Sequence, residues 1–288
     1  MRVLRTPHEM RAWALKARAA GHSIGLVPTM GALHAGHLSL MRACRDGNDR
    51  AVVSIFVNPT QFAPHEDFDA YPRTWETDSA EAEALDFDAI YAPAASAMYP
   101  DGYATYVDVT GISAGLCART RPHFFRGVAT VVTKLFAAVL PDRAYFGEKD
   151  AQQLAVVRRL ARDLDLGVEV VGCPLVRDAD GLALSSRNKY LTPEDRQRAL
   201  AISRGLDAAR AALDAGESDA ATLVELVRAA MAGLDIDYVE LVDADTMQPL
   251  DEARGTIVLA AAAHVGAARL IDNLRYTVAP VAAPALKE

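Results

Sequence analysis

Long apolar runs are missing from this 288-residue chain. No stretch approaches the roughly 18 apolar residues that a membrane-spanning helix needs. The segment MRVLRTPHEMRAWALKARAAG, with which the sequence begins, also lacks the continuous apolar core of a secretory signal. We therefore expect a cytoplasmic protein that does not act in a membrane.

Cysteine is also scarce. Cys44, Cys117 and Cys173 lie far apart, are odd in number and lack the spacing of metal ligands. This usage argues against a disulfide framework or a zinc site, and it is typical of small buried side chains in a reducing compartment.

An excess of positive charge is missing as well. The chain has 30 Lys and Arg against 38 Asp and Glu, which gives a formal net charge of −8. Because binding to a phosphate backbone needs a concentrated basic surface, we expect no nucleic-acid partner, and the absence of an appended basic domain disfavours a role in tRNA charging. An anionic ligand would have to meet a local positive pocket.

What is present is the composition of an ordinary globular enzyme, with 51% hydrophobic and 24% charged residues. Apolar strands alternate with helices through the first part of the chain. This alternation predicts an α/β domain built on a doubly wound, Rossmann-like parallel sheet, in which ligands bind beyond the carboxyl ends of the strands. The expected strands are 23–29, 50–58, 87–93, 143–147 and 167–174, and the expected helices are 10–20, 37–46, 75–86, 127–140 and 150–165.

The pattern changes after Val176. A loop is followed by two alanine-rich helices between 193 and 233, and then by strands at 237–243, 255–265 and 268–274. Helices followed by successive strands favour a small α+β domain. We therefore predict domains at 1–176 and 177–288, with a loose tail from 278.

The segment VPTMGALHAGHLSL places His34 and His37 after the first buried strand, at the start of a helix. Unpaired backbone N–H groups and the helix dipole favour an anion there, and Gly36 allows a ligand to approach the backbone. A phosphate chain would suit this pair. Two other interpretations stay open at this point: satisfied structural histidines, and half of a metal site.

The segment FGEKD likewise ends a strand and opens a helix, so Gly147, Lys149 and Asp150 should share the edge of the sheet with the histidines. Lys149 offers a point charge for phosphates, and Asp150 an acceptor for ribose hydroxyls or a metal ion. A solvated lysine and a helix-capping aspartate are the alternatives.

Two further loops fit the same edge. LSSRN, residues 184–188, supplies two hydroxyls and a guanidinium that suit a polyphosphate. FVNPTQF places Asn58 and Gln61 beside Phe62, and Gln153 lies one turn into the helix after FGEKD. Neutral amides beside an aromatic wall suit a small hydroxylated acid with an aliphatic body, although a lone glutamine is more often a surface residue.

Five segments together resemble the pantothenate synthetase family in order and spacing: PTMGALHAGH, SIFVNPTQF, YPRTWETD, FGEKDAQQL and GLALSSRNKYL. They span essentially the whole chain and are far more specific than HxGH alone, which many nucleotidylyl transferases and class I synthetases share. The resemblance implies a ligase that condenses pantoate with β-alanine and ATP to give pantothenate, AMP and diphosphate through an enzyme-bound pantoyl adenylate. It also implies Mg²⁺ held mainly by the ATP phosphates, a homodimer, and a smaller C-terminal domain acting as a lid.

The resemblance further implies roles for single residues. His37 would be the proton donor, with His34, Lys149, Ser185, Ser186 and Arg187 beside the phosphates. The whole ATP site would comprise Met30, Gly31, Ala32, Leu33, His34, Ala35, Gly36, His37, Gly147, Glu148, Lys149, Asp150, Val176, Leu184, Ser185, Ser186 and Arg187. The pantoate site would comprise Gln61 and Gln153, with Gln61 also near β-alanine, and the apolar Pro28, Met30 and Phe62; Asn58 joins it from the residue pattern.

Two positions depart from the family pattern. Leu184 stands where methionine is usual, an apolar exchange of similar volume. In RPHFFRGV, His123 stands where the family has glycine and Phe124 where it has histidine. If that glycine supplied a positive φ, the loop must relax here, and we assign this loop no catalytic residue.

Two other functions are compatible with part of this sequence pattern. An adenylyltransferase that joins AMP to a phosphorylated coenzyme precursor would also use HxGH and a late serine-rich loop. A catalytically silent nucleotide-binding regulator would keep the fold, although sensing alone would not require the full set of phosphate-binding residues.

Overall fold

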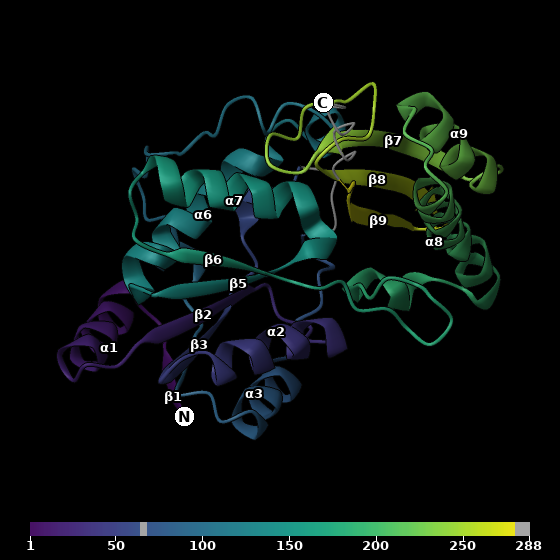
Figure 1. Ribbon diagram of the computed structural model, residues 1–288. Helices are drawn as coiled ribbons and strands as arrows, with labels where there is room; N and C mark the ends of the chain where they lie inside the picture. The colour runs from purple at the N-terminus through teal and green to yellow at the C-terminus, as the bar shows by residue number, and fades with distance from the viewer. Residues whose placement is uncertain (64–67, 280–288) are drawn as a thin grey trace, which may run out of the picture. The chain divides into compact units, whose positions relative to one another are not determined.

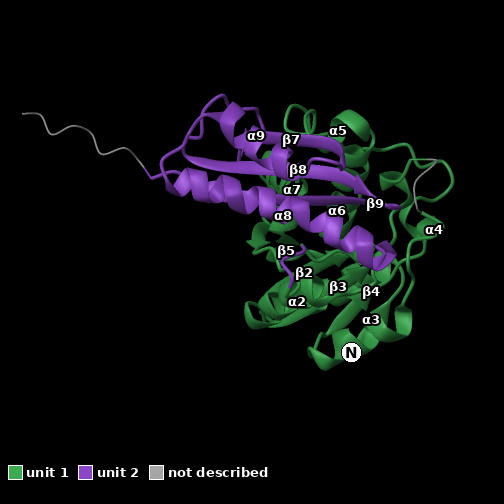
Figure 2. Cartoon of the chain, turned by 90° about the vertical axis from the view of Figure 1, so that its right-hand side faces the viewer, with its two compact units in different colours: residues 1–179, 183–188 green, residues 180–182, 189–288 purple. Residues whose placement is uncertain are grey.

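The computed structural model describes residues 1–63 and 68–279. These residues form two compact units, coloured separately in Figure 2: residues 1–179 with 183–188, and residues 180–182 with the chain from 189 onward. The expected loose tail lies almost entirely outside the described residues. Within the described ranges, no helix is long and apolar enough to cross a membrane.

The first unit is built on a six-stranded parallel sheet, which confirms the predicted Rossmann-like fold class (Figure 1). The strand order is β1-β4-β3-β2-β5-β6. The strands are β1 Arg2–Leu4, β2 Ile24–Thr29, β3 Arg50–Ile55, β4 Ala89–Tyr91, β5 Arg143–Gly147 and β6 Glu169–Cys173. The sequence predicted all of them except β1, which is only three residues long and carries little apolar surface.

Helices cover both faces of this sheet (Figure 1). The core on one face joins the strands to α1 Pro7–Ala19, α6 Phe124–Val139 and α7 Ala151–Asp163. The core on the other face joins them to α2 Ala35–Asp46 and α3 Trp75–Ala84. Alternation along each strand produces this division, because Leu26 faces the first core and Val27 the second.

The first unit also has four short helical segments among its described residues: η1 Pro59–Gln61, α4 Ala95–Met98, α5 Cys117–Thr120 and η2 Glu148–Asp150. A fifth, η3 Ser186–Tyr190, begins in the first unit and ends in the second. Their length explains why hydrophobic periodicity did not predict them. Cys44 and Cys173 are buried, as expected of small apolar side chains, and Cys117 is partly exposed; all three are free thiols.

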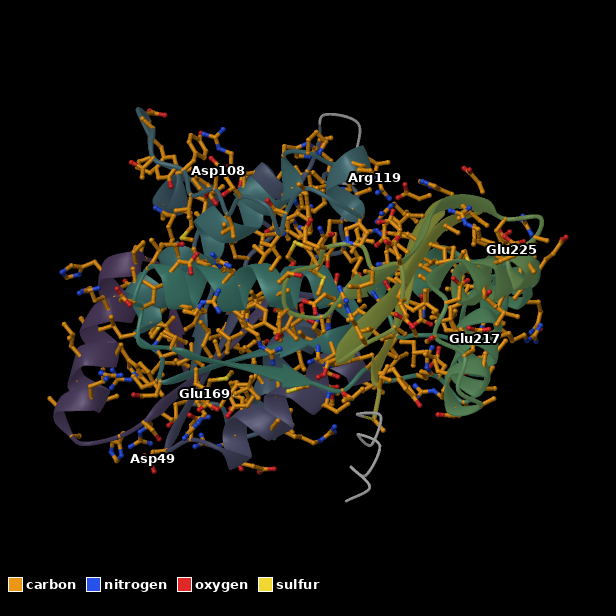
Figure 3. The ribbon with its side chains drawn as sticks, turned by 45° about the horizontal axis from the view of Figure 1, so that its top comes forward. Asp49, Asp108, Arg119, Glu169, Glu217 and Glu225 are labelled. Atoms are coloured by element: carbon orange, nitrogen blue, oxygen red, sulfur yellow. The ribbon has the colours of Figure 1, made fainter. Side chains whose placement is uncertain are left out.

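The amino-terminal edge of the parallel sheet is closed by polar pairs. Figure 3 labels Asp49 and Glu169, which lie at this edge before β3 and at the start of β6. Asp49 accepts hydrogen bonds from the backbone and hydroxyl of Ser23, and Glu169 pairs with Arg143 over 2.9 Å. These pairs lie at the amino-terminal ends of the strands, whereas the motifs predicted to carry chemistry lie at the carboxyl ends of β2 and β5.

The second unit has the predicted α+β composition. Its three-stranded antiparallel sheet runs in the order β7-β8-β9 and packs on two helices. The elements are α8 Pro193–Asp214, α9 Ala220–Ala230, β7 Asp235–Asp243, β8 Thr256–Val265 and β9 Ala268–Thr277. A core of Leu and Val side chains joins the sheet to both helices.

Candidate active site

The order of the strands creates a switch point beside β2. After β2 the chain passes through α2 to β3 and then to β4, whereas after β4 it returns through α6 to β5 on the other side of β2. The loops that follow β2 and β5 therefore run to opposite faces of the sheet. This is the topological switch point at which open α/β sheets bind their ligands. HxGH follows β2 and FGEKD ends β5, so both motifs meet at this point.

The loop from Thr29 to His34 has a strained, closely held shape. Gly31 and Ala32 have φ values of +84° and +52°. The left-handed conformation costs a residue with a Cβ about 1–2 kcal/mol, so Ala32 must be held in place by its contacts. The buried carboxylate of Asp78 provides them: it accepts from the backbone N–H groups of Ala32 at 3.0 Å and of Leu33 at 2.9 Å.

The two histidines of the motif lie against each other. Their ring centroids are 4.1 Å apart and the rings are tilted by 40°. His34 is the N-cap residue of α2, and its Nδ1 accepts from the backbone N–H of Gly36 at 3.2 Å. Since Nδ1 accepts, the neutral ring carries its proton on Nε2, which leaves Nε2 as a donor for an anion. The buried Nδ1 of His37 has no hydrogen-bond partner among the described residues.

Both rings are neutral at pH 7. Burial, followed by the positive charge of Lys149, lowers the pKa of His34, while Asp150 and Asp178 act in the opposite direction. Burial, with the neighbouring His34 and Lys149, lowers the pKa of His37 to about 3. The imidazoles therefore act in the free site as hydrogen-bond donors rather than as stored positive charges.

Lys149 brings the permanent positive charge. Its side chain is 19% exposed, and its Nζ lies 4.0 Å from Oδ2 of Asp150, whose side chain is 46% exposed. β2 and β5 are paired neighbours in the parallel sheet, so the loops that follow them begin side by side, and the positive charge of Lys149 adds to burial in lowering the pKa of both histidines. The predicted convergence of HxGH with FGEKD is thus present in the fold.

The serine-rich loop returns to the same unit. Leu184 donates its backbone N–H to the carbonyl of Val176 at 3.0 Å, and a Cβ built on Gly36 would lie 3.8 Å from the Leu184 Cβ. Ser185 Oγ accepts from the backbone N–H of Arg187 at 3.2 Å. Residues 183–188 therefore cluster with the first unit, whereas a boundary at 176/177 assigns them to the second.

The side-chain amides of Asn58 and Gln61, which were predicted to hold a substrate, bind each other. Nδ2 of Asn58 donates to Oε1 of Gln61 at 2.8 Å and to the carbonyl of Gly127 at 3.1 Å. Oδ1 of Asn58 accepts from the hydroxyls of Tyr99 and Thr60 at 2.7 and 3.0 Å. Asn58 is 1% exposed, so its amide is engaged by the protein and orients Gln61 instead of facing a ligand. This differs from the substrate contact expected for Asn58.

The other residues expected to bind a substrate are partly exposed. Gln153 is partly exposed in the first turn of α7, and its amide has no hydrogen bond to any described residue. Its neighbour Gln152 is buried and instead holds residues 112–117 through the carbonyls of Ile112 and Gly115 and the N–H of Cys117. Phe62 and Pro28 are both partly exposed, and the Phe62 ring packs edge-on against Phe68 and Tyr71.

The segment that departs from the family pattern places no backbone strain on His123, although the buried Nε2 of its ring has no hydrogen-bond partner among the described residues. His123 has a φ of −83°, so the position does not need the freedom of glycine. The guanidinium of Arg121 stacks over the Phe124 ring at 4.1 Å and donates to the carbonyl of Gln61 at 3.1 Å. Phe124 therefore supports an arginine that contacts the Asn58–Gln61 segment.

The side chains near the candidate site limit how the protein could hold the Mg²⁺ expected with ATP. Among the described residues, no group of three or more His, Cys, Asp or Glu side chains could enclose a metal ion. A hard cation such as Mg²⁺ is commonly held by one or two carboxylates and by substrate phosphates, and the half-exposed carboxylate of Asp150 beside Lys149 fits such a role.

Four residues of this region were missed by sequence reasoning: Asp78, Tyr99, Gly127 and Gln152. Asp78 was visible within YPRTWETD and Gln152 within FGEKDAQQL, but no periodicity shows which loop a buried side chain will hold. Gly127 marks a close approach, since a Cβ there would clash with the Thr60 carbonyl oxygen.

Comparisons with known proteins agree over 95% of the chain. Residues 2–275 match the family model described as pantoate-beta-alanine ligase. Proteins named pantothenate synthetase from Acetivibrio thermocellus and Moorella thermoacetica are 50% and 53% identical to it; the alignments cover 95% of this chain and 99% and 98% of theirs.

Solved structures agree as well. A crystal structure of pantothenate synthetase from Thermus thermophilus superposes with a TM-score of 0.89 at 45% identity, covering 95% of this chain and 99% of that one. A pantoate-beta-alanine ligase from Francisella tularensis, complexed with beta-gamma ATP and beta-alanine, gives a TM-score of 0.78 at 33% identity, covering 95% and 97% of the two chains.

The parallel sheet with HxGH at its switch point defines a nucleotide-binding α/β protein of the HxGH class. Within that class, this chain belongs to the pantoate-beta-alanine ligase family.

Proposed function

We propose that this protein condenses pantoate with β-alanine, using ATP and releasing AMP and diphosphate through an enzyme-bound pantoyl adenylate. The observation that carries the proposal is the meeting of His34, His37 and Lys149 at the switch point, with the ordered amide of Gln61 in the segment that follows the neighbouring strand β3. Family membership supplies the substrates, and this arrangement supplies sites of suitable chemistry for an anionic nucleotide and a small hydroxy acid.

In the first step a carboxylate oxygen of pantoate attacks the α-phosphorus of ATP. A bond forms between that oxygen and phosphorus, and the bond to the leaving diphosphate breaks. No protein nucleophile is needed, so the residues contribute position and charge stabilisation. Lys149 supplies a fixed positive charge, and the neutral imidazoles of His34 and His37 donate hydrogen bonds as negative charge grows on the departing oxygens.

The serine-rich loop adds further donors to the same task. Its backbone is placed beside the start of α2 by the approach of Leu184 to Gly36. We assign Ser185, Ser186 and Arg187 to the phosphates, where a guanidinium and hydroxyls form charge-assisted hydrogen bonds. Mg²⁺ bound with ATP would neutralise part of the phosphate charge, with Asp150 as the carboxylate available to it.

Pantoate is assigned to the amides. The bond from Asn58 to Oε1 fixes the orientation of the Gln61 amide, and we assign its Nε2 group to donate to a pantoate oxygen. Gln153 provides the second amide, while Pro28, Met30 and Phe62 provide apolar surface for the dimethyl group.

In the second step the neutral amine of β-alanine attacks the acyl carbon of the adenylate, forms the amide bond and expels AMP. The amine loses a proton, and the phosphate oxygen of AMP leaves with the electron pair of the acyl–oxygen bond. Water must be kept from the adenylate during this step. That residues 177–288 serve as a lid, that the protein is a homodimer and that it is cytoplasmic are also part of the proposal; light scattering during gel filtration tests the dimer.

Isotope exchange between diphosphate and ATP tests the first step. We expect labelled diphosphate to enter ATP only when pantoate is present, and pantothenate with AMP to form once β-alanine is added. Exchange without pantoate would reject the proposal. An adenylyltransferase would instead give a dinucleotide-like product with no requirement for an amine.

A further inference from the structure

We propose that Asp78 is a positioning residue of the HxGH motif: it holds the loop that sets both histidine rings against the nucleotide phosphates, without itself touching a substrate. The kinetic test of this inference rests on the proposed function. The contacts that support the inference all lie within the first unit.

Asp78 is 1% exposed, and both of its carboxylate oxygens are used. Oδ1 accepts from the backbone N–H of Leu33 at 2.9 Å. Oδ2 accepts from the backbone N–H of Ala32 at 3.0 Å and from the hydroxyl of Thr74 at 3.1 Å. Thr74 is the N-cap residue of α3, yet its side chain caps no backbone N–H group of the helix. Its hydroxyl binds Asp78 instead.

The loop that Asp78 holds has the shape of an anion-binding concavity. Successive backbone N–H groups around left-handed residues point toward one centre and bind anions. Here Gly31 and Ala32 are left-handed, and the N–H groups of Ala32 and Leu33 converge on a carboxylate from the protein itself. These two amides are therefore occupied by the protein itself, and we assign the phosphates to the start of α2, which His34 caps.

Glycine at position 31 permits this approach. A Cβ there would lie 2.9 Å from Oδ2 of Asp78 and 3.2 Å from the Ile55 Cγ2, in addition to the strain imposed by a φ of +84°. The side chain of Asp78 thus sits against the loop backbone itself. A small movement of the carboxylate would have to move the loop.

The loop transmits this position to the histidines. Leu33, held by Asp78, immediately precedes His34. His34 is fixed as the N-cap of α2 by its bond from Gly36, and its ring stacks 4.1 Å from the ring of His37. Release of Leu33 would therefore shift the His34 ring first and the His37 ring through it.

A second, partly buried carboxylate provides a matched control. Asp88 lies just before β4 and accepts from the backbone N–H of Ala51 at 2.9 Å and from Arg45 and Arg50 at 2.8 Å each. It belongs to the same unit and makes a comparable set of bonds, but at the amino-terminal edge of the sheet. Loss of its charge removes packing and hydrogen bonding without altering the HxGH loop.

The test compares Asp78→Asn with Asp88→Asn in the full chain. An asparagine at 78 must turn an NH₂ group toward one of the two backbone donors, so the loop cannot stay as it is. We expect kcat for pantoate-dependent diphosphate release to fall by about 10²-fold and KM for ATP to rise, while KM for β-alanine stays constant. Asp88→Asn should lower the unfolding midpoint yet leave kcat and both KM values unchanged.

Thr74→Ala is the milder variant, because it removes one of the three bonds to Asp78 and keeps the charge. If Asp78→Asn does not fold by circular dichroism, a raised KM for ATP in Thr74→Ala supports the assignment and an unchanged one overturns it. Equal kinetic losses in Asp78→Asn and Asp88→Asn would also overturn it. If the unmodified protein releases no diphosphate with pantoate, the proposed function fails. Where that activity is present, an Asp78→Asn variant that retains it in full overturns the assignment of Asp78 alone.

Discussion

The side-chain amide of Asn58 donates to the side-chain carbonyl oxygen of Gln61 over 2.8 Å. This bond fixes the orientation of the Gln61 amide and leaves its Nε2 group to donate to a ligand. Asn58 is itself fixed by the hydroxyl of Tyr99 and the carbonyl of Gly127. The direction in which Gln61 presents its donor is therefore set by residues that need not touch the substrate.

Replacing Asn58 by alanine should free the Gln61 amide to rotate. We expect KM for pantoate to rise by about tenfold, since a hydrogen bond to a charged group contributes about 1.5–3 kcal/mol, while KM for ATP stays the same. Steady-state kinetics with each substrate varied in turn measures both values. Asn48→Ala is the matched control: Asn48 is also buried, but binds Cys44 and Tyr145 away from the site. A pantoate KM that rises equally in both variants would count against the orienting role.

Gly127→Ala should disturb the same segment through the backbone. A Cβ at this position would clash with the carbonyl oxygen of Thr60 and lie 2.9 Å from the backbone nitrogen of Gln61, so α6 or η1 must move. We expect a loss of stability of about 1–3 kcal/mol in urea unfolding, together with a raised KM for pantoate. Gly115→Ala, where a Cβ would meet nothing within 4 Å, is the control and should change neither quantity.

Burial of His37 makes stability depend on pH in a defined direction. The pKa of His37 falls from its ordinary 6.5 to about 3 in the folded protein. Between these values the unfolded chain binds a proton that the folded chain does not, so stability is lost as the pH falls below about 6.5. This histidine contributes a slope of about 1.4 kcal/mol per pH unit in that window.

Urea unfolding at pH 7, 6 and 5 measures the slope. His37→Gln cannot titrate, so its stability should fall less steeply with decreasing pH than that of the unmodified protein. The difference isolates His37 from the carboxylates that titrate in both. Parallel curves would mean that the His37 ring is accessible to protons in the folded state.

Most of the fold could be predicted from hydrophobic pattern alone. Continuous apolar segments such as those containing Leu26 and Val53 indicated the buried strands. The change after Val176, from alternating strands and helices to helices followed by successive strands, indicated a second unit. The short strand β1 carried too little apolar signal. The path of residues 180–188 was equally hidden, because contacts between distant segments, such as Leu184 beside Gly36, leave no periodicity in the sequence.

The candidate site shows the same division. Residues whose chemistry is conspicuous, such as His37 and Lys149, could be singled out because strand ends of a parallel sheet lie at one edge. Residues that act by orienting other residues could not be singled out from the sequence. Asp78 is one aspartate in an acidic helix, and only its folded position shows that it binds two loop amides. Asn58 was recognised as polar and near the site, but its contacts turn it toward Gln61.

Replacing Ala32 by glycine should stabilise the protein, because Ala32 has the left-handed backbone conformation. Ala32 has a φ of +52° and Gly can adopt this conformation without the steric cost of a Cβ. Ala32→Gly should therefore raise the free energy of unfolding by about 0.5–1 kcal/mol, the strain relieved less the added freedom of the unfolded chain. Ala12→Gly, at an exposed position within α1 of the same unit, should instead lower it by about 1 kcal/mol.

Urea unfolding followed by circular dichroism compares the two variants directly. Ala32→Gly should also keep its activity, because the bonds from Asp78 to the backbone N–H groups at positions 32 and 33 do not depend on the Ala32 side chain. Equal destabilisation by the two substitutions would show that the loop carries no strain at Ala32. Opposite signs would mean that the carboxylate of Asp78 holds the loop in a shape that the residue at 32 does not itself favour.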